Sequence, residues 1–392
     1  MAEFAAILFG SGIGLFVYTY ALYPGLLKVL GLGKHGVASP KDPDVWPTVS
    51  VSLPTYNEEH QIAETLESLL SLDYPKDRLQ ILVVSDASTD RTDEIVRAYG
   101  DRGVELLRIP ERQGKGASEN AATAHLTGEI VVNTDASIRI VPDALKPLIR
   151  QFSNRDVGLA SGRDISVASG AENTNEGESR YVGYEMAIRN LETRVGSIVG
   201  ASGCFYAIRR HLHQVPLPVS LSRDFAAALH CRERDYRAVS VPEAICYVPR
   251  VASLRREYRR KVRTITRGLQ TLLYKRHVMN PFRYGLFSWM LFSHKVCRWI
   301  VPWAAVTSLV GLTLMALSTP WARVALVAFV AGALMGSLGW LMSERRDLPW
   351  FLAFPAFGLI GNVAAMHAAL RVLHGDQDAL WDPTRRVPTT GK

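Results

Sequence analysis

Three acidic residues and one lysine stand at positions where ligand chemistry is expected. Asp86 and Asp135 directly follow short apolar runs, and Lys115 lies between two glycines. A carboxylate at such a place is able to hold Mg²⁺ together with substrate phosphates, with Ser137 adding a hydroxyl, or to accept hydrogen bonds from a base or ribose. A lysine ammonium group meets phosphate as a point charge. Together these side chains predict a site for a nucleotide diphosphate.

Asp224 is the candidate general base for an incoming hydroxyl group. It follows a predicted loop, residues 215–220, that contains two prolines, and it opens a predicted helix over residues 225–231. A positioned base contributes about 10²–10⁴-fold to a rate. Aspartate is also favoured as a helix N-cap, so spacing alone leaves both interpretations of Asp224 open.

These side chains require a scaffold of strands that end at one edge. Apolar runs predict strands over residues 49–54, 81–85, 104–109 and 129–133, and helical patterns separate them, including residues 115–126. This alternation predicts an α/β domain with a mostly parallel sheet. Ligands bind at the carboxyl ends of such strands, where Thr55, Asn57, Asp86 and Asp135 stand. Neither GxGxxG nor GxxxxGK[ST] occurs, so a dinucleotide site and a P-loop are not supported.

Both ends of the chain are apolar enough to cross a membrane, which takes about 20 residues per helix. The candidate stretches cover residues 4–30, 299–318, 322–342 and 350–373. Lys28 and Lys34 after the first stretch place the polar middle in the cytoplasm. Three later crossings would leave the C-terminus outside, whereas Arg371, Arg385 and Arg386 favour the inside. The alternative is a set of buried helices in a large soluble core.

The expected division of the chain follows from this pattern. It comprises an N-terminal transmembrane helix (1–32), a cytoplasmic domain (44–252), basic amphipathic interface helices (253–298), C-terminal transmembrane helices (299–375) and a polar tail (376–392).

The net charge of +8 raises the question of an acidic partner. Seven of the thirteen residues over 255–267 are basic, next to the predicted membrane part. They favour lipid phosphates, or a leaving diphosphate, as their partner. No nucleic-acid module is present, so no nucleic-acid partner is expected. The four cysteines form no CxxC pair and are expected to be buried free thiols.

Seven motifs carry a family resemblance. In chain order they are PTYNEE, VVSDASTD, RQGKGASEN, NTDAS, GASGCFYAIRR, SRDF and RKVRTITRG. This order over residues 48–300, with membrane helices on both sides, resembles the membrane-bound family 2 glycosyltransferases, which include hyaluronan, chitin, cellulose and poly-N-acetylglucosamine synthases. The resemblance implies a GT-A-type, Rossmann-like domain inserted between transmembrane helices, inversion at the anomeric carbon, a UDP-sugar donor, and Mg²⁺ or Mn²⁺.

The resemblance also implies roles for individual residues. Asp224 looks like the base aspartate of the family's T-E-D motif, and Asp135 looks like the first acid of its metal motif, with Ser137 in the place of the second acid. The remaining matches are nucleotide-sugar contacts at Thr55, Asn57, Glu58, Asp86, Lys115, Asp135 and Arg263, and acceptor-side positions at Gly203, Cys204 and Arg260.

Three departures from the family pattern bear on these roles. Ser137 replaces the second acid of D-x-D, and Ser222-Arg223-Asp224 keeps only the aspartate of T-E-D. Arg260-Lys261-Val262-Arg263-Thr264 lacks the tryptophan of Q-x-x-R-W, an aromatic platform for the acceptor sugar. Tyr258 and Trp299 are the candidate replacements.

The expected function is inverting transfer from a UDP-sugar to a growing polysaccharide or oligosaccharide, at the cytoplasmic face of a bacterial inner membrane. The alternative within the same class is a single addition to a polyprenyl-phosphate or other lipid acceptor. A non-catalytic sensor of nucleotide sugars is the alternative from another class, and the retained aspartates speak against it.

Overall fold

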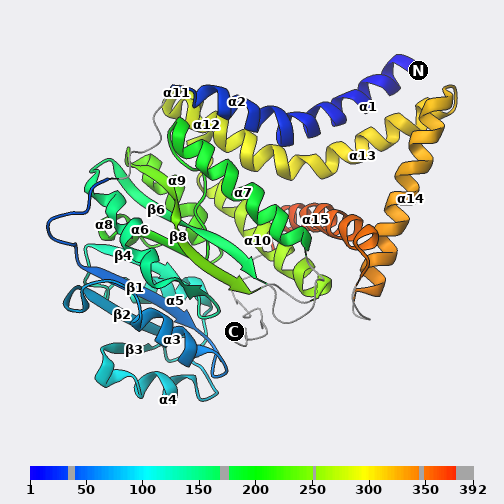
Figure 1. The fold of residues 1–392 in the computed structure, drawn as a ribbon. Coiled ribbons are helices and arrows are strands. Elements are labelled where there is room, and N and C mark those ends of the chain that lie inside the picture. Colours follow the sequence, from blue (N-terminus) through cyan, green and yellow to red (C-terminus); the bar gives the residue numbers. More distant parts are fainter. Residues whose placement is uncertain (34–39, 168–175, 250–252, 344–347, 377–392) are drawn as a thin grey trace.

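A computed structural model describes residues 1–33, 40–167, 176–249, 253–343 and 348–376. An α/β domain occupies one side of the molecule, and long helices from both chain ends extend from it (Figure 1). The tail expected over 376–392, with Arg385 and Arg386, lies outside the described residues except for Asp376.

The domain is built on one sheet of eight strands in the order β3-β2-β1-β4-β7-β6-β8-β5. The strands are β1 (Val49–Thr55), β2 (Leu79–Ser85), β3 (Val104–Arg108), β4 (Ile130–Thr134), β5 (Arg139–Ile140), β6 (Val157–Val167), β7 (Phe205–Arg209) and β8 (Arg237–Pro249). The expected parallel sheet holds from β3 to β4. Beyond β4 the sheet is mixed, because β7 pairs antiparallel with both β4 and β6.

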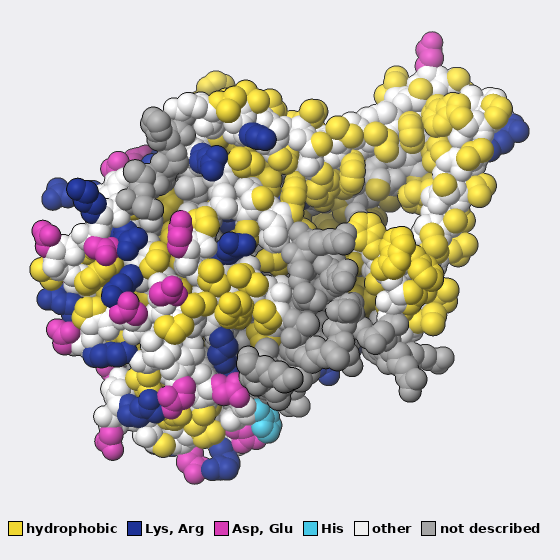
Figure 2. Space-filling view, in the orientation of Figure 1, with side chains coloured by type: hydrophobic (Ala, Val, Ile, Leu, Met, Phe, Trp, Pro, Cys, Tyr) yellow, Lys and Arg dark blue, Asp and Glu magenta, His cyan; other side chains and the backbone are white. Residues whose placement is uncertain are grey.

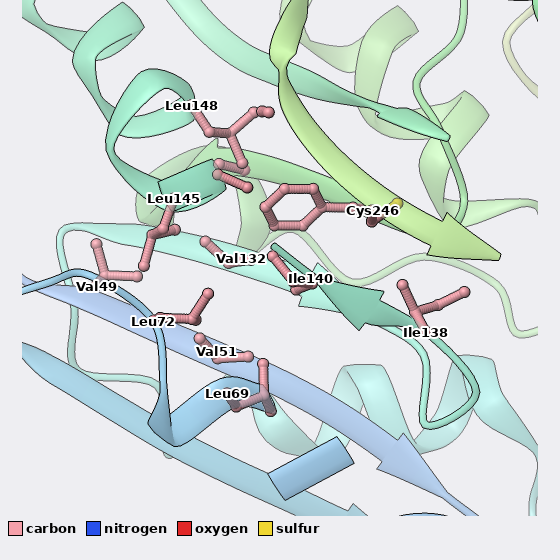
Figure 3. Close-up of a cluster of buried hydrophobic side chains, with 14 of the residues drawn as sticks. Val49, Val51, Leu69, Leu72, Val132, Ile138, Ile140, Leu145, Leu148 and Cys246 are labelled. Atoms are coloured by element: carbon pink, nitrogen blue, oxygen red, sulfur yellow. The ribbon is translucent and has the colours of Figure 1, made fainter. Parts of the chain in front are cut away.

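β-branched residues explain why these runs form strands. Val49, Val51 and Val132 are buried in the central strands, where such side chains pack well on a pleated surface. Figure 3 shows them in one cluster with Leu145 and Leu148 from a covering helix. The cluster fixes the register of β1 against β4, and therefore where each strand ends.

Short helices complete the domain and place the loops at the sheet edge. They are α3 (Ile62–Leu70), α4 (Thr92–Arg97), α5 (Lys115–Ala122), α6 (Leu145–Arg150), α7 (Glu176–Val195), α8 (Arg210–His213) and α9 (Arg223–Glu233), with 3₁₀ turns η2 (Lys76–Arg78), η3 (Gly100–Arg102), η4 (Pro142–Ala144) and η5 (Gln151–Ser153). The helix predicted over 115–126 ends four residues early, at Ala122.

Four apolar helices are long enough to cross a membrane: Ala2–Leu30, Leu286–Ala316, Pro320–Met342 and Trp350–Leu373. The first joins α1 (Ala2–Val17), the π-helical η1 (Tyr18–Leu22) and α2 (Tyr23–Leu30), and the second joins α12 (Leu286–Leu291), η7 (Phe292–Val296) and α13 (Cys297–Ala316). The others are α14 (Pro320–Met342) and α15 (Trp350–Leu373). The second helix begins at Leu286, thirteen residues before the predicted Trp299, because Lys295 and Arg298 are accommodated within it.

The apolar side chains of these helices are largely uncovered. In the most apolar window of α14 only 11% of the residues are buried, and Val324 and Val327 are 70% and 69% exposed. Figure 2 shows a broad hydrophobic surface over this part of the molecule, whereas the charged side chains gather on the domain. Apolar surface on this scale requires a lipid or protein environment, so a soluble core made of these helices is excluded.

Small residues bring α1 and α13 into close contact. A Cβ atom added at Gly311 would lie 2.5 Å from Phe9 N and 2.6 Å from Ala5 O. Ser308 also donates a hydrogen bond to Phe9 O at 3.0 Å. Small residues at a helix crossing are typical of packing in membranes, where backbones must approach closely.

We expect Gly311→Ala to separate these two helices. The added methyl group overpacks the crossing and lowers the free energy of unfolding by about 1–3 kcal/mol. Thermal melting of the purified protein in detergent measures the effect. Gly332→Ala is the matched control, because a Cβ there meets nothing within 4 Å. Equal melting temperatures for the two variants would contradict the close packing.

The last helix runs beside α10 (Leu254–Tyr274), the basic segment of the sequence. Leu254 of α10 packs against Ala356 and Ile360 of α15, and Gln270 donates a hydrogen bond to Asp376 O at 2.9 Å. Both ends of α10 therefore contact the chain around α15, so the described end of the chain returns to the domain. After α10, the chain reaches the membrane helix through η6 (Arg276–Met279) and α11 (Pro281–Tyr284).

Candidate active site

One cleft of about 420 Å³ lies at the carboxyl end of β4, between the domain, α10 and the membrane helix. Its volume is within the range of small-molecule sites. It contains most of the residues that the sequence singled out: Glu58, Lys115, Asp135, Ser137, Gly203, Cys204, Asp224, Arg260 and Arg263. Asp135 and Asp224, which are far apart in the chain, therefore open into the same space.

Asp135 is held at the cleft wall by an ion pair with Lys115. Lys115 begins α5, and Gly114 before it adopts a positive φ of 89°. Burial opposes the charged form of Lys115, but Asp135 and Glu119 outweigh that effect and raise the pKa of the lysine above its ordinary value. The lysine therefore stays cationic next to the carboxylate.

A second ion pair links this group to the helix of Asp224. Glu119 lies 3.9 Å from Lys115 Nζ and 3.4 Å from Arg223 Nε. All three side chains are at least four-fifths buried, so their charges are weakly screened by solvent. The pairs connect α5 to the start of α9, and thus the Asp135 side of the cleft to the Asp224 side.

Asp224 lies in the first turn of α9, but it is not the helix N-cap. Ser222 occupies the cap position, and its hydroxyl donates to Asp224 Oδ1 at 2.6 Å. Gly203 faces the other carboxylate oxygen, because a Cβ there would lie 3.3 Å from Asp224 Oδ2. The N-cap interpretation is therefore wrong, and the carboxylate is directed into the cleft.

The loop before Asp224 is anchored from two sides. Asn120 of α5 donates to Leu217 O at 2.8 Å. Arg267 of α10 donates to Val219 O at 2.9 Å and to Leu221 O at 2.7 Å. The basic helix α10 thus positions the loop that precedes Asp224, in addition to lining the cleft.

The far end of α9 is fixed to the start of η6. Lys275 Nζ lies 2.6 Å from Glu233 Oε2. Burial opposes ionisation of Glu233, but hydrogen bonds from His230 and Lys275 prevail and lower its pKa to about 2. The helix that carries Asp224 is therefore held at both ends.

Three predicted nucleotide contacts lie behind the cleft lining. Asp86 is 3% exposed and accepts 2.8 Å hydrogen bonds from the backbone N–H groups of Gln113 and Gly114. Thr55 is buried beneath it, and Asn57 accepts a hydrogen bond from Thr89 N at 2.8 Å. Asp86 positions the loop that begins α5, and direct nucleotide contact by these three residues stays a prediction.

Of the two aromatic residues considered in place of the missing tryptophan, the structure brings Trp299 into the cleft. Trp299 belongs to α13 and packs on Gly268, where a Cβ would lie 3.0 Å from its ring. Tyr258 instead hydrogen-bonds His367 at 2.7 Å, outside the cleft lining.

Several cleft residues had no sequence signal. Asp164 on β6 accepts a 2.6 Å hydrogen bond from Ser202, and the buried Tyr206 hydroxyl has no hydrogen-bond partner in the part of the chain that the structure describes. Arg189 and Lys295 line the cleft from α7 and η7. Asp164, Arg189 and Lys295 stand outside the predicted strand ends and motifs, so only the packing of distant segments reveals them, whereas Tyr206 lies within the motif GASGCFYAIRR. No disulfide joins the four cysteines, and Cys231, Cys246 and Cys297 are buried as predicted, whereas Cys204 is half-buried.

A divalent cation is compatible with the donor set at Asp135. The described residues contain no group of three or more His, Cys, Asp and Glu side chains that could hold a metal. Asp135 and Ser137 therefore offer one carboxylate and one hydroxyl. That is what Mg²⁺ or Mn²⁺ requires where substrate phosphates supply the other oxygen ligands. A metal bound there would share Asp135 with Lys115.

The structure is an α/β domain with a cleft, joined to four apolar helices that are long enough to cross a membrane. Residues 50–215 match the family model "Glycosyl transferase family 2". The chain is 26% identical over 234 residues to the poly-beta-1,6-N-acetyl-D-glucosamine synthase of Staphylococcus epidermidis, covering 57% of this chain and 55% of that protein. It is 40% identical over 95 residues to the probable glycosyltransferase YdaM of Bacillus subtilis, covering 23% of each.

A solved structure shares the fold along nearly the whole chain. It is the mannosyltransferase PcManGT from Pyrobaculum calidifontis in complex with GDP-Man and Mn²⁺, with a TM-score of 0.74 and 24% identity over 96% of this chain and 99% of that one. The chain spans about half or less of the length of the curated relatives named above. Residues 50–215, which make up much of the α/β domain, are therefore similar to glycosyltransferase family 2.

Proposed function

We propose that the protein transfers a sugar from a nucleotide diphosphate donor to an acceptor hydroxyl group, with inversion, at the cytoplasmic membrane face. The observation that carries this proposal is the shared cleft of Asp135 and Asp224, which also reaches Lys295 and Trp299 of a membrane helix. A donor site, a base and a membrane wall around one cavity are what such a transfer requires.

On the donor side, negative charge develops on the leaving diphosphate. Lys115 and Arg263 line the cleft as cations that oppose this charge. Asp135 and Ser137 would hold Mg²⁺ or Mn²⁺, which supplies further charge neutralisation when bound. Electrostatic stabilisation of this kind acts best in a partly enclosed site, where water screens it least.

On the acceptor side, Asp224 accepts the proton of the attacking hydroxyl group. The hydroxyl oxygen forms the new bond to the anomeric carbon while the bond to the diphosphate breaks, so the configuration inverts. The Ser222 hydroxyl stabilises the ionised carboxylate through its 2.6 Å hydrogen bond and keeps it oriented towards the cleft. Asn57, Asp86 and Glu58 remain candidates for contacts to the nucleoside.

The acceptor is a growing glycan or a lipid-linked molecule. Trp299 offers an aromatic face for a sugar ring in either case. The lipid-linked acceptor is favoured by one observation, namely that the cleft wall includes Lys295 and Trp299 from the helix Leu286–Ala316. Basic residues beside the apolar segments support the placement of the domain on the cytoplasmic side of the membrane.

A donor screen tests the proposal. Membranes containing the protein are expected to release UDP or GDP from one sugar nucleotide, in the presence of Mn²⁺, well above membranes without it. Mass analysis of the product then separates the two acceptors, because glycan extension yields a ladder of lengths and single addition yields one species. Donor binding without turnover across all UDP- and GDP-sugars and acceptor extracts would favour the sensor instead.

A further inference from the structure

The membrane end of the cleft contains two basic side chains that lie on either side of one carboxylate oxygen, Glu185 Oε1. Arg189 comes from α7 in the domain, and Lys295 comes from η7 within the membrane helix. Lys295 Nζ lies 5.7 Å from the centre of the Phe225 ring, next to Asp224 in the chain. A Cβ at Gly200 would lie 3.5 Å from the same nitrogen, so Gly200 borders the space around the ammonium group.

Arg189 is buried with unused hydrogen-bond donors. The residue is 7% exposed, and its Nη2 donates to Ala201 O at 3.1 Å. Among the described residues, its Nη1 and Nε have no hydrogen-bond partner, although Nε lies 3.8 Å from Glu185 Oε1. A buried guanidinium group with unpaired N–H groups is costly unless a ligand satisfies them.

The neighbouring carboxylates are occupied by other partners. Glu185 lies 2.5 Å from Arg298 Nη1 and 3.0 Å from His294 Nε2. Glu192 accepts hydrogen bonds of 2.6 Å from Tyr23 and 3.2 Å from Val199 N, and lies 2.6 Å from His294 Nδ1.

This arrangement leaves an excess of positive charge towards the cleft. Three basic side chains, Arg189, Lys295 and Arg298, lie between 2.5 and 3.8 Å from the single carboxylate of Glu185. Arg298 and His294 tie α7 to the membrane helix, which is a structural role. Arg189 and Lys295 are the members that line the cleft, and Lys295 lies 3.5 Å from Glu185, farther than Arg298 does.

We propose that Arg189 and Lys295 bind a phosphate group carried by a membrane-borne acceptor, in a subsite next to Asp224. The inference rests on the proposed function and names the acceptor class as a phospholipid-like molecule whose hydroxyl group reaches Asp224. Phosphate suits two convergent cations and a planar guanidinium fork. A lipid is the favoured carrier, because Lys295 and Trp299 belong to the helix that enters the membrane.

Binding of decyl phosphate to the full chain in a neutral detergent tests the subsite. Decyl phosphate is expected to bind the wild-type protein, measured by a thermal shift or by tryptophan fluorescence, and Lys295→Met is expected to weaken binding about 10–100-fold. Lys295→Arg retains the charge and is expected to recover most of the affinity. Lys275→Met is the matched control, since it removes a buried, Glu233-paired lysine outside the cleft.

The alternative outcomes each overturn a defined part of the proposal. Equal affinity of the wild-type protein and Lys295→Met for decyl phosphate would overturn the subsite. Loss of decyl phosphate binding at a saturating concentration of sugar nucleotide would also overturn it, because the two ligands would then share one site. Binding of inorganic phosphate as tight as that of decyl phosphate would overturn the lipid source. If Lys295→Met melts well below Lys275→Met, Arg189→Met provides the same comparison.

Measuring both nucleotide release and decyl phosphate binding on the wild-type protein distinguishes failure of this inference from failure of the proposed function. Nucleotide release by wild-type protein without any selective binding of decyl phosphate would remove only the subsite. Selective binding without nucleotide release from any donor would keep the subsite and remove the transferase assignment.

Discussion

Replacing Asp224 with asparagine is expected to lower the transfer rate by about 10²–10⁴-fold, the usual contribution of a positioned base. The asparagine oxygen still accepts the hydrogen bond from Ser222, so the start of α9 remains in place. The amide has no basicity at neutral pH and cannot take the proton of the acceptor hydroxyl group. The effect should therefore fall on kcat.

Initial rates of nucleotide release, with donor affinity measured separately, check this result. The donor affinity should change little, because Asp224 lies on the acceptor side of the cleft. Asp73→Asn is the control, as Asp73 is a surface carboxylate paired with Lys146 at 2.7 Å. Full activity of Asp224→Asn would discard the base assignment.

Replacing Asp135 with asparagine is expected to lower kcat/KM by about 10²–10³-fold, through lost stabilisation of the leaving diphosphate. The substitution removes the ionic partner of Lys115 and the carboxylate proposed to hold a metal. Glu119 remains 3.9 Å from Lys115, so the lysine stays close to a negative charge and the fold should persist.

A titration of activity with Mn²⁺ distinguishes this role from a structural one. The half-saturating Mn²⁺ concentration should rise in Asp135→Asn and stay unchanged in Asp73→Asn, and a chelator should abolish wild-type activity. An unchanged Mn²⁺ titration in Asp135→Asn, with normal turnover, would remove Asp135 from the metal and diphosphate site.

The departures from the family motifs acquire a physical explanation in this cleft. Arg223, where the family has an acid, pairs with the buried Glu119 at 3.4 Å and so becomes part of the charge network between donor and acceptor sides. Trp299, a proposed replacement for the tryptophan missing after Arg263, enters the cleft from the next long helix. The first explanation requires a contact between residues about a hundred positions apart, which spacing does not reveal.

Local pattern was enough to predict the scaffold around β1, β2, β3 and β4. Runs such as Val49–Thr55 are apolar, β-branched and followed by polar residues, so their strand ends could be read directly. The same reading indicated Asp135 and Asp224, because each follows or opens a recognisable element. The role of Asp86 was harder to predict from the sequence, since its carboxylate accepts hydrogen bonds from the backbone N–H groups of residues 113 and 114.

The sequence by itself determined the α/β domain, the apolar helices around it and the acidic residues of the cleft, because these depend on hydrophobic periodicity and on residues at element ends. Only the tertiary structure decided that β7 runs antiparallel, that α15 returns beside α10, and that Arg189 and Lys295 meet near Asp224. These features arise from packing between segments that lie far apart in the chain, and local periodicity does not indicate which distant surfaces pack together.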